Sequence, residues 1–354
     1  MTPERELALP PAPISVGNAA GHPAFGTYRG ELPEVDFSRL SGRYHLSAAQ
    51  RLLKHKRWVY SLVVTPEIIA AFAIVDLSYT SNAFAVAVDL RDEKVLFDGG
   101  YLGLPGPLAK VGDRPGEGLE ARFRTVGAKL SCERTLGRER YDLDVDILHI
   151  PFVREGLRWQ GGILAGGGNP PPLTVISPVD GGGVVNVTQK RAGLPAVGRL
   201  HTAGRTFDLS GGVAGMDYTN GYLARHTAWR WALGLGRLAD GTPIGLNLVE
   251  GFNDGDTNAC ENALWIGNRL VRLGAARFDF NPVAVMNEWR LTTEDGAVDL
   301  RFRPIHVHRE ERDYKVVRSH FVQPFGRFEG TVKVDGRSLQ VQLAGVSEDQ
   351  DILW

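Results

Sequence analysis

The sequence predicts an all-β protein in which two antiparallel β-barrels or sandwiches follow one another, with few short helices. Short runs of alternating apolar and polar residues recur along the chain, which is the pattern of half-buried strands. The 43 glycines and 20 prolines are spread over the 354 residues, as expected for many turns. Because about twenty short strands are too many for one simple sandwich, we expect two units.

The composition excludes several classes of protein. The hydrophobic fraction is 43%, the charged fraction is 23% and the formal net charge is −1, so no overall positive charge attracts nucleic acid or an anionic membrane. No apolar run has the length of a membrane helix, and the first residues lack the pattern of a signal peptide. Cys132 and Cys260 form no disulfide framework, which suits a reducing compartment. We expect a cytoplasmic protein without an integral membrane segment or a nucleic-acid partner.

The predicted elements divide the chain into an arm and two strand-rich parts. Residues 1–40 form an extended arm that prolines restrict, residues 41–200 the first barrel and residues 201–354 the second, joined in the region of residues 190–215. A helix is expected over residues 47–57, with Ser47 as its N-cap. Strands are expected at 56–64, 68–75, 83–90, 94–97, 119–133, 139–150, 173–176, 183–189, 223–235, 242–252, 262–273, 276–280, 288–292, 298–303, 316–325, 327–334 and 338–345.

Two other segments have a predicted role. Residues 216–221, Met-Asp-Tyr-Thr-Asn-Gly, are expected to form turns, because Asp, Asn and Gly favour turn conformations. The final residue, Trp354, is an aromatic side chain that we expect to plug a barrel or a seam between the two units.

The most unusual side chains lie in a predicted hairpin over residues 223–252, with Asp240-Gly241 as its turn. Side chains alternate between the two faces of a strand, so Arg225, Trp229 and Trp231 share one face of the first strand. On the second strand, Glu250 is the only carboxylate in a row with Ile244, Leu246, Leu248 and Phe252. We interpret the hairpin as a pocket wall on which Arg225, the two tryptophans and Glu250 converge, while His226 and Arg230 face away.

Three residues of this region are candidates for catalysis. A carboxyl group in an apolar wall stays protonated more easily, so Glu250 is the expected general acid; the alternative is an ion pair with Arg225 or Arg269. Asp217 is a second acid or base, the group that orients Arg225, or a turn residue. Arg225 either binds an anionic group of the substrate or stacks on an aromatic ring.

The expected ligand wall is aromatic with a few polar anchors. Trp229 and Trp231 either fill the core or face a ligand, and Trp265 extends their wall. The remaining residues assigned to substrate binding are Tyr218, Asn247, Asn253 and Asn262.

His306 and His308 form a His-x-His pair on one strand face, which is two thirds of a metal site. No third ligand is adjacent in the sequence, so we expect surface or hydrogen-bonded histidines and no metal. No Ser-His-Asp signature is present.

Several segments resemble the family called domain of unknown function 2804. They are Lys56-Arg57-Trp58-Val59-Tyr60, Asp217-Tyr218-Thr219-Asn220-Gly221, Arg225-His226-Thr227-Ala228-Trp229-Arg230-Trp231, Asn247-Leu248-Val249-Glu250-Gly251 and Phe325-Gly326-Arg327-Phe328-Glu329-Gly330. The central pattern of Asp, Gly, two tryptophans and Asp-Gly is also similar to a wider two-barrel, lipocalin-like group, which includes carotenoid 1,2-hydratases, AttH proteins, tocopherol cyclases and Diels–Alderase-type cyclases. This resemblance implies two tandem calycin-like barrels and a pocket for an apolar, often polyene- or terpenoid-like, molecule.

The first hypothesis is therefore a cofactor-independent hydratase, isomerase or cyclase that acts on a hydrophobic small molecule, with Glu250 as proton donor and Asp217 and Arg225 in support. The second is a non-catalytic lipid or terpenoid carrier, and the third is a structural barrel with a filled interior. A homodimer is compatible with the sequence, which does not identify the substrate.

Overall fold

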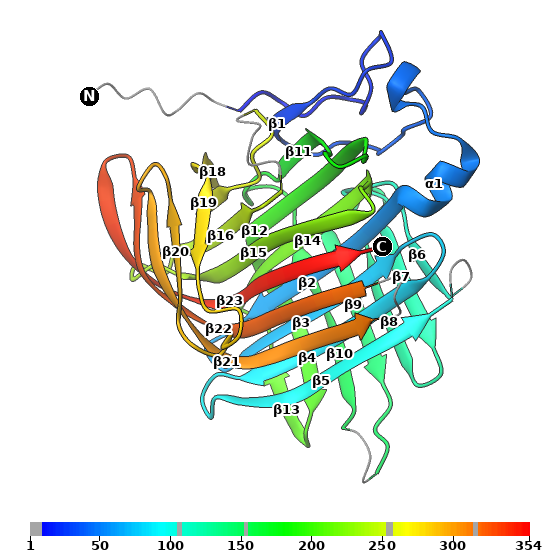
Figure 1. Ribbon diagram of the computed structural model, residues 1–354. Helices are drawn as coiled ribbons and strands as arrows, with labels where there is room; N and C mark the ends of the chain where they lie inside the picture. Colours follow the sequence, from blue (N-terminus) through cyan, green and yellow to red (C-terminus); the bar gives the residue numbers. More distant parts are fainter. Residues whose placement is uncertain (1–8, 105–107, 152–154, 253–257, 314–317) are drawn as a thin grey trace.

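The computed structural model describes residues 9–104, 108–151, 155–252, 258–313 and 318–354, and it consists of two antiparallel sheets that pack against one another (Figure 1). The predicted all-β fold of two tandem curled sheets is confirmed. The α-helix α1, Ala48–Lys54, begins at the predicted N-cap: Ser47 and Gln50 form a capping box. It ends three residues before the predicted end, because the strand β2 begins at His55.

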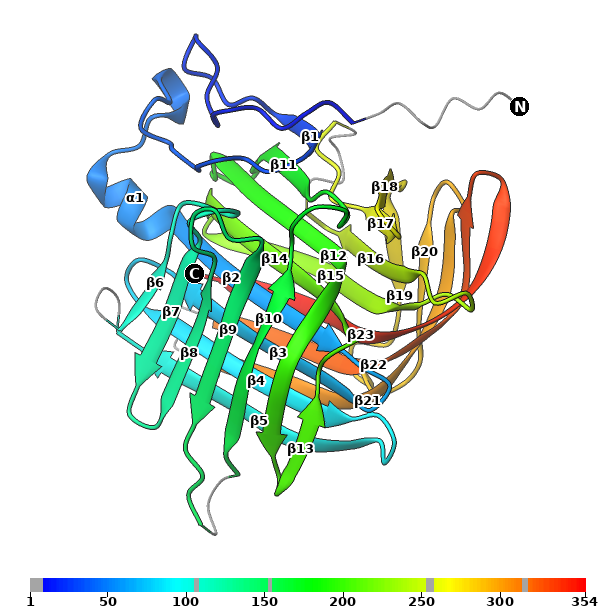
Figure 2. The same ribbon diagram turned by 180° about the vertical axis from the view of Figure 1, so that it is seen from behind.

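The first sheet contains fourteen strands. Its main path, in spatial order, is β5 (Lys94–Gly103), β4 (Ser81–Asp89), β3 (Ile68–Asp76), β2 (His55–Val64), β14 (Val213–Tyr222), β12 (Val185–Thr202), β10 (Leu157–Leu164), β9 (Arg140–Ile147), β8 (Ala128–Glu133), β7 (Glu120–Thr125) and β6 (Ala109–Val111). Strands β1 (Gly26–Arg29), β11 (Leu173–Pro178) and β13 (Arg205–Asp208) lie off this path. Figure 2 shows β7 to β10 crossing over β3 to β5, so the first sheet curls into a nearly closed barrel.

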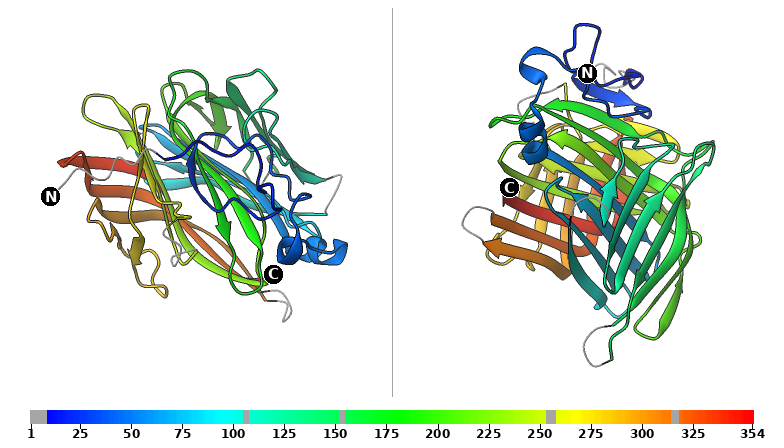
Figure 3. Two further views of the ribbon diagram at one scale, coloured as in Figure 1. Left: turned by 90° about the horizontal axis from the view of Figure 1, so that it is seen from above. Right: turned by 90° about the vertical axis from the view of Figure 1, so that its right-hand side faces the viewer.

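The second sheet contains nine strands and curls into a half-barrel. In spatial order they are β18 (Arg269–Arg272), β17 (Ala263–Ile266), β16 (Pro243–Glu250), β15 (His226–Arg237), β23 (Arg337–Leu353), β22 (Arg318–Val334), β21 (Val298–Asp313), β20 (Trp289–Thr293) and β19 (Ala276–Asp279). In Figure 3, the orange and red strands β21 to β23 lie alongside the blue strands of the first sheet.

Strand β2 shows how alternation supplies two cores at once. Val59 and Val63 point into the core inside the first sheet, whereas Tyr60 and Leu62 belong to a second core between the two sheets. A third core lies inside the second sheet. Strands β3 and β4 likewise contribute to the first two cores. Because both of their faces are buried, the sequences of these two strands are almost continuously apolar.

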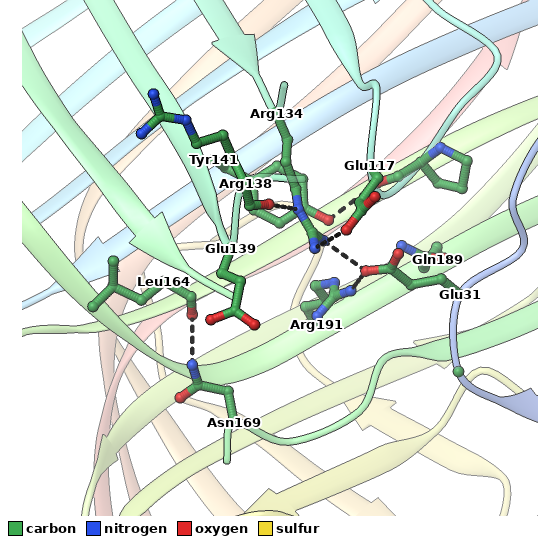
Figure 4. Close-up of polar contacts among 12 residues, drawn as sticks. Glu31, Glu117, Arg134, Arg138, Glu139, Tyr141, Leu164, Asn169, Gln189 and Arg191 are labelled. Atoms are coloured by element: carbon green, nitrogen blue, oxygen red, sulfur yellow. Dashed lines mark hydrogen bonds and ion pairs between the residues drawn. The ribbon is translucent and has the colours of Figure 1, made fainter. Parts of the chain in front are cut away.

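The N-terminal arm closes one end of the first sheet. Its strand β1 pairs with β11, and Glu31 beyond it accepts hydrogen bonds from the buried guanidinium groups of Arg134 and Arg191 (Figure 4). Both guanidinium groups lie over the ring of Tyr141, 5.2 Å and 5.7 Å from its centre. The arm is therefore attached to the barrel through charge as well as through strand pairing.

Two expectations about the middle of the chain are wrong. Residues 216–221 form the centre of strand β14 rather than turns, because Asp217 and Asn220 have hydrogen-bond partners on neighbouring elements and do not need local turn bonds. Since β14 pairs with β2 and β12, the first sheet continues to Tyr222, and residues 223–225 join the two sheets rather than the region 190–215. Among the described residues, no helix is long and apolar enough to cross a membrane.

Candidate functional site

A cavity lies between the two sheets rather than inside either of them. It contains about 950 Å³ of empty space, part of it open to solvent. Strands β2, β3, β4, β12 and β14 supply one wall, and β15, β16, β21, β22 and β23 supply the other. The aromatic residues that line it are Trp58, Tyr60, Phe84, Trp229, Trp231, Phe252, Phe321 and Trp354.

The aromatic rings form ordered pairs across the interface between the sheets. Trp58 and Trp229 stack with centres 5.9 Å apart and planes 14° apart. Trp231 meets Tyr60 edge to face at 5.1 Å. These contacts fix the ring faces that an apolar ligand would meet. Trp229 and Trp231 both lie on the wall of this cavity.

Glu348 is a buried acid in this wall. It lies on β23 directly opposite Trp231. Its Oε1 accepts a hydrogen bond of 2.9 Å from Trp229 Nε1, and its Oε2 accepts one of 2.7 Å from Gln323 Nε2. Burial raises the pKa of Glu348 to about 7, because the two hydrogen bonds only partly compensate the loss of hydration. Among the described residues, no cationic side chain lies within ion-pair distance of this carboxyl group.

A buried ion cluster joins Lys190 and Asp217 of the first sheet to Glu261, which lies between β16 and β17 of the second sheet. Lys190 Nζ is 2.6 Å from Asp217 Oδ1 and 3.3 Å from Glu261 Oε2. Trp58 Nε1 and Thr188 Oγ1 also donate to Asp217. Burial lowers the pKa of Lys190, but the two carboxylates outweigh this and raise it, so the ammonium stays charged. Asp217, predicted from the sequence, therefore does line the cavity, as the partner of Lys190.

Glu250, the predicted proton donor, lies outside the cavity. Its Oε2 accepts a hydrogen bond of 3.0 Å from the backbone N–H of Phe278, and Arg277 and Arg230 lie 3.4 Å and 4.0 Å from the carboxylate. This is the ion-pair alternative, with Arg230 and Arg277 in place of the expected arginines.

The register of the hairpin explains the difference. A two-residue turn at Asp240-Gly241 would put Glu250 opposite Trp231. The loop instead has three residues: Gly241 has φ +85°, its N–H donates to Leu238 O, and Arg237 pairs with Pro243. Glu250 then lies opposite Arg230, on the other face of the sheet, because a shift of one residue exchanges the faces of a strand.

The other predicted site residues support the wall or lie elsewhere. The side chain of Asn247 accepts a hydrogen bond of 2.8 Å from Trp231 Nε1 and donates one to the backbone oxygen of Glu261. Asn247 therefore orients the ring of Trp231 and holds the backbone at Glu261 in place. Asn262 bonds the backbone of Val249 and Gly274, and Trp265 donates to Pro171 O. Neither of these two residues lines the cavity.

Tyr218 points into the core of the first sheet and donates to Gly112 O. Arg225 is exposed, and its backbone carbonyl accepts from Trp354 N–H. Neither residue lines the cavity. Asn253 lies outside the described residues.

The two histidines of the His-x-His pair share one carboxylate. His306 Nε2 and His308 Nδ1 each lie 2.6 Å from an oxygen of Asp98, on the first sheet. Burial raises the pKa of Asp98, but hydrogen bonds from both histidines outweigh it and lower the pKa to about 2. Within the described part of the chain, no group of three metal-ligating side chains is found. The histidines thus join the two sheets.

Lys190, Glu261 and Glu348 are the residues that the sequence prediction missed. The predicted strand 183–189 ended one residue before Lys190, although the alternation of Asn186, Thr188 and Lys190 continues through it. Glu348 follows the predicted end of the last strand at residue 345, whereas β23 continues to Leu353. Nothing in the local pattern separates these charged residues from solvent-facing ones.

The chain was compared with known families and structures. A family model described as "Domain of unknown function (DUF2804)" matches residues 10–354. The crystal structure of CghA with Sch210972 is similar with a TM-score of 0.51 and 8% identity, over 97% of this chain and 97% of that chain. An AttH-like protein of Nitrosomonas europaea has a TM-score of 0.43 and 14% identity, over 86% of this chain and 96% of that one. No curated protein matches the chain. At these identities the likeness to CghA shows the fold alone.

Proposed function

The chain belongs to the family described as domain of unknown function DUF2804, and from the cavity between its sheets we propose that it is a cofactor-independent enzyme that transfers a proton to an apolar small molecule. The observation that carries this proposal is Glu348. It is a fully enclosed carboxyl group with a pKa of about 7 that faces an aromatic cavity. A general acid works best when its pKa is close to the pH at which it acts.

The surroundings of Glu348 suit proton transfer to a carbon–carbon double bond. The O–H proton moves to one alkene carbon, which takes the π electron pair, and the other carbon becomes a cation. The faces of Trp58, Trp229 and Trp231 stabilise that cation through their π electrons. Loss of a proton from an adjacent carbon to the Glu348 carboxylate then gives an isomer and restores the acid. Addition of water, with one of its protons returned to Glu348, gives a hydrated product instead.

The fold is compatible with a bound small molecule. CghA, which has the same fold, was crystallised with Sch210972. In this chain the aromatic rings give the cavity an apolar surface, and polar side chains from both sheets lie beside it, so the cavity can hold an apolar body and orient it through polar contacts. The alternative function, a carrier, needs the same cavity but no proton transfer.

An experiment with Glu348→Gln separates the two functions. A small-molecule extract of the source cells is incubated with the wild-type protein, with Glu348→Gln and with Glu250→Gln, and is followed by mass spectrometry. We expect compounds that the wild type and Glu250→Gln convert but Glu348→Gln only binds, because glutamine keeps the shape of the site and has no acidic proton. The variant Glu250→Gln is the matched control, since it also removes a carboxylate but lies outside the cavity. Equal conversion by Glu348→Gln, or binding without any conversion by all three proteins, would overturn the proposal.

A further inference from the structure

The ion cluster in the cavity wall contains two acidic side chains for one basic side chain. The ammonium group of Lys190 forms ion pairs with both Asp217 and Glu261. All three side chains are almost fully buried, with relative exposures of 4%, 6% and 5%. Burial raises the pKa of Glu261, Lys190 lowers it, and repulsion by Asp217 adds to the rise. Because these buried side chains have little contact with water, their charges are poorly screened. A further cation in the cavity would therefore offset the carboxylate that Lys190 leaves uncompensated.

The indole N–H groups of the wall already donate to acceptors within the protein. The indole N–H of Trp58 donates to Asp217, and that of Trp231 to Asn247. The remaining two indole groups of the wall also have acceptors: Trp229 donates to Glu348 and Trp354 to Thr227. A ligand carboxylate or phosphate would have to displace one of these bonds to accept from an indole group, whereas a ligand that donates hydrogen bonds would not.

A buried acceptor in the wall lacks a donor. Asn186 lies on the same face of β12 as Thr188 and Lys190, lines the cavity and is 3% exposed. Its Oδ1 has no hydrogen-bond partner among the described residues. Leaving a buried acceptor without a donor is unfavourable, so Asn186 favours a ligand that brings an N–H group to this separate part of the wall.

The aromatic wall already accommodates an ammonium group. Lys190 Nζ lies 5.8 Å from the centre of the Trp231 ring, within the range of a cation–π contact. The stacked pair of Trp58 and Trp229 presents further π faces to the same cavity.

We propose that the cavity takes an amphiphilic organic cation, whose protonated amine lies at Asp217 and Glu261 and whose apolar body lies against the tryptophans. This inference rests on the proposed function, because it names the substrate class of the same cavity. In this inference the ammonium group of the ligand binds beside Lys190, Asp217 and Glu261, and Glu348 remains the proton donor.

The test compares three probes with the same hydrocarbon chain: octylamine, 1-octanol and octanoate. Binding to the full-length protein is measured at pH 7 by calorimetry and by quenching of tryptophan fluorescence. The amine is protonated at this pH, as a lysine side chain is. We expect octylamine to bind about tenfold or more tightly than octanol, and octanoate more weakly than either.

The variant Glu261→Gln tests where the cation binds. It leaves Lys190 and Asp217 as a balanced pair, so we expect the preference for octylamine over octanol to fall to about twofold or less while octanol binding stays unchanged. Glu250→Gln is the control and keeps the full preference. If Glu261→Gln is unfolded by circular dichroism, the three-probe series on the wild type still decides the question.

The outcomes separate this inference from the proposed function. Octanol or octanoate binding as tightly as octylamine overturns the cation preference but leaves the apolar cavity and the role of Glu348 intact. Equal preference in Glu261→Gln and the wild type overturns the assignment of the ammonium to this cluster. Failure of all three probes to bind the folded wild type contradicts the apolar cavity itself, and with it the proposed function.

Discussion

Trp229 Nε1 donates a hydrogen bond of 2.9 Å to Glu348 Oε1, and the two residues are 119 positions apart in the sequence. The bond connects the aromatic wall to the buried acid across the adjacent strands β15 and β23. Gln323 holds the second oxygen, and Tyr60 in turn donates to Gln323 at 3.2 Å. The orientation of the carboxyl group is therefore set by side chains from three strands.

The variant Trp229→Phe keeps a ring against Trp58 but removes the hydrogen bond to Glu348. Because this bond stabilises the carboxylate more than the acid, we expect the pKa of Glu348 to rise further, by about one unit. Titration of the labelled Glu348 carboxyl carbon by NMR measures the change. Trp354→Phe is the matched control, since the Trp354 indole donates to Thr227 instead. An unchanged pKa in Trp229→Phe would show that the hydrogen bond does not influence the acid.

The variant Glu348→Gln should change how stability depends on pH. The pKa of Glu348 is about 7 in the folded protein, against a reference value of 4.5. Between these pH values the folded state binds more protons than the unfolded state, so the free energy of unfolding of the wild type falls as pH rises from 4.5 to 7. Glutamine does not titrate, and we expect the variant to gain on the order of 3 kcal/mol relative to the wild type between pH 4 and pH 8.

Urea denaturation of both proteins at the two pH values measures this difference. A constant difference in the free energy of unfolding would mean that Glu348 titrates near its ordinary pKa.

The variant Asp98→Asn should weaken the junction between the sheets. The folded-state pKa of Asp98 is about 2, below its reference value of 3.8, so its contribution to stability is present above 3.8 and is lost as pH falls through 2. We expect the variant to lose about 1–2 kcal/mol at pH 7. Urea denaturation between pH 7 and pH 3 should show that the difference narrows towards acid pH. A full-sized loss that persists at pH 3 would argue against the two histidine contacts as its source.

The variant Trp354→Ala should open one end of the cavity. The Trp354 ring lies 5.3 Å from Lys56 Nζ, and burial lowers the pKa of this lysine to about 7. Without the ring, water reaches the amine, and we expect its pKa to rise towards the reference value of 10.5. NMR titration of the labelled lysine measures this, and Trp354→Phe, which keeps an aromatic cover, should shift it less. An unchanged pKa would show that the ring of Tyr79, whose centre lies 4.1 Å from Lys56 Nζ, covers the amine by itself.

Local sequence patterns predicted the fold class and part of the cavity wall. Alternation identified most strands and placed Trp229 and Trp231 on one face, since neighbouring side chains on a strand necessarily point in opposite directions. The N-cap of α1 was also visible, because a capping box needs only residues three positions apart.

The identity of the acid depended on contacts that no local pattern contains. Asp240-Gly241 marks a turn in the sequence but does not show whether the loop has two or three residues. The third loop residue shifts the register by one, which moves Glu250 to the face of the sheet opposite Trp231. Likewise Glu348 becomes a buried acid because its strand pairs with β15 and the first sheet covers that face.

By itself, then, the sequence determined that the chain forms antiparallel strands and which side chains share a face of each strand, because these follow from backbone geometry over a few residues. The tertiary structure alone decided that the two sheets meet around a cavity, that Glu348 rather than Glu250 is enclosed there, and that Lys190 joins Asp217 and Glu261. The physical reason is that burial and pairing of charges depend on strand register and on which face meets the partner sheet, and both are set by contacts between residues far apart in the chain.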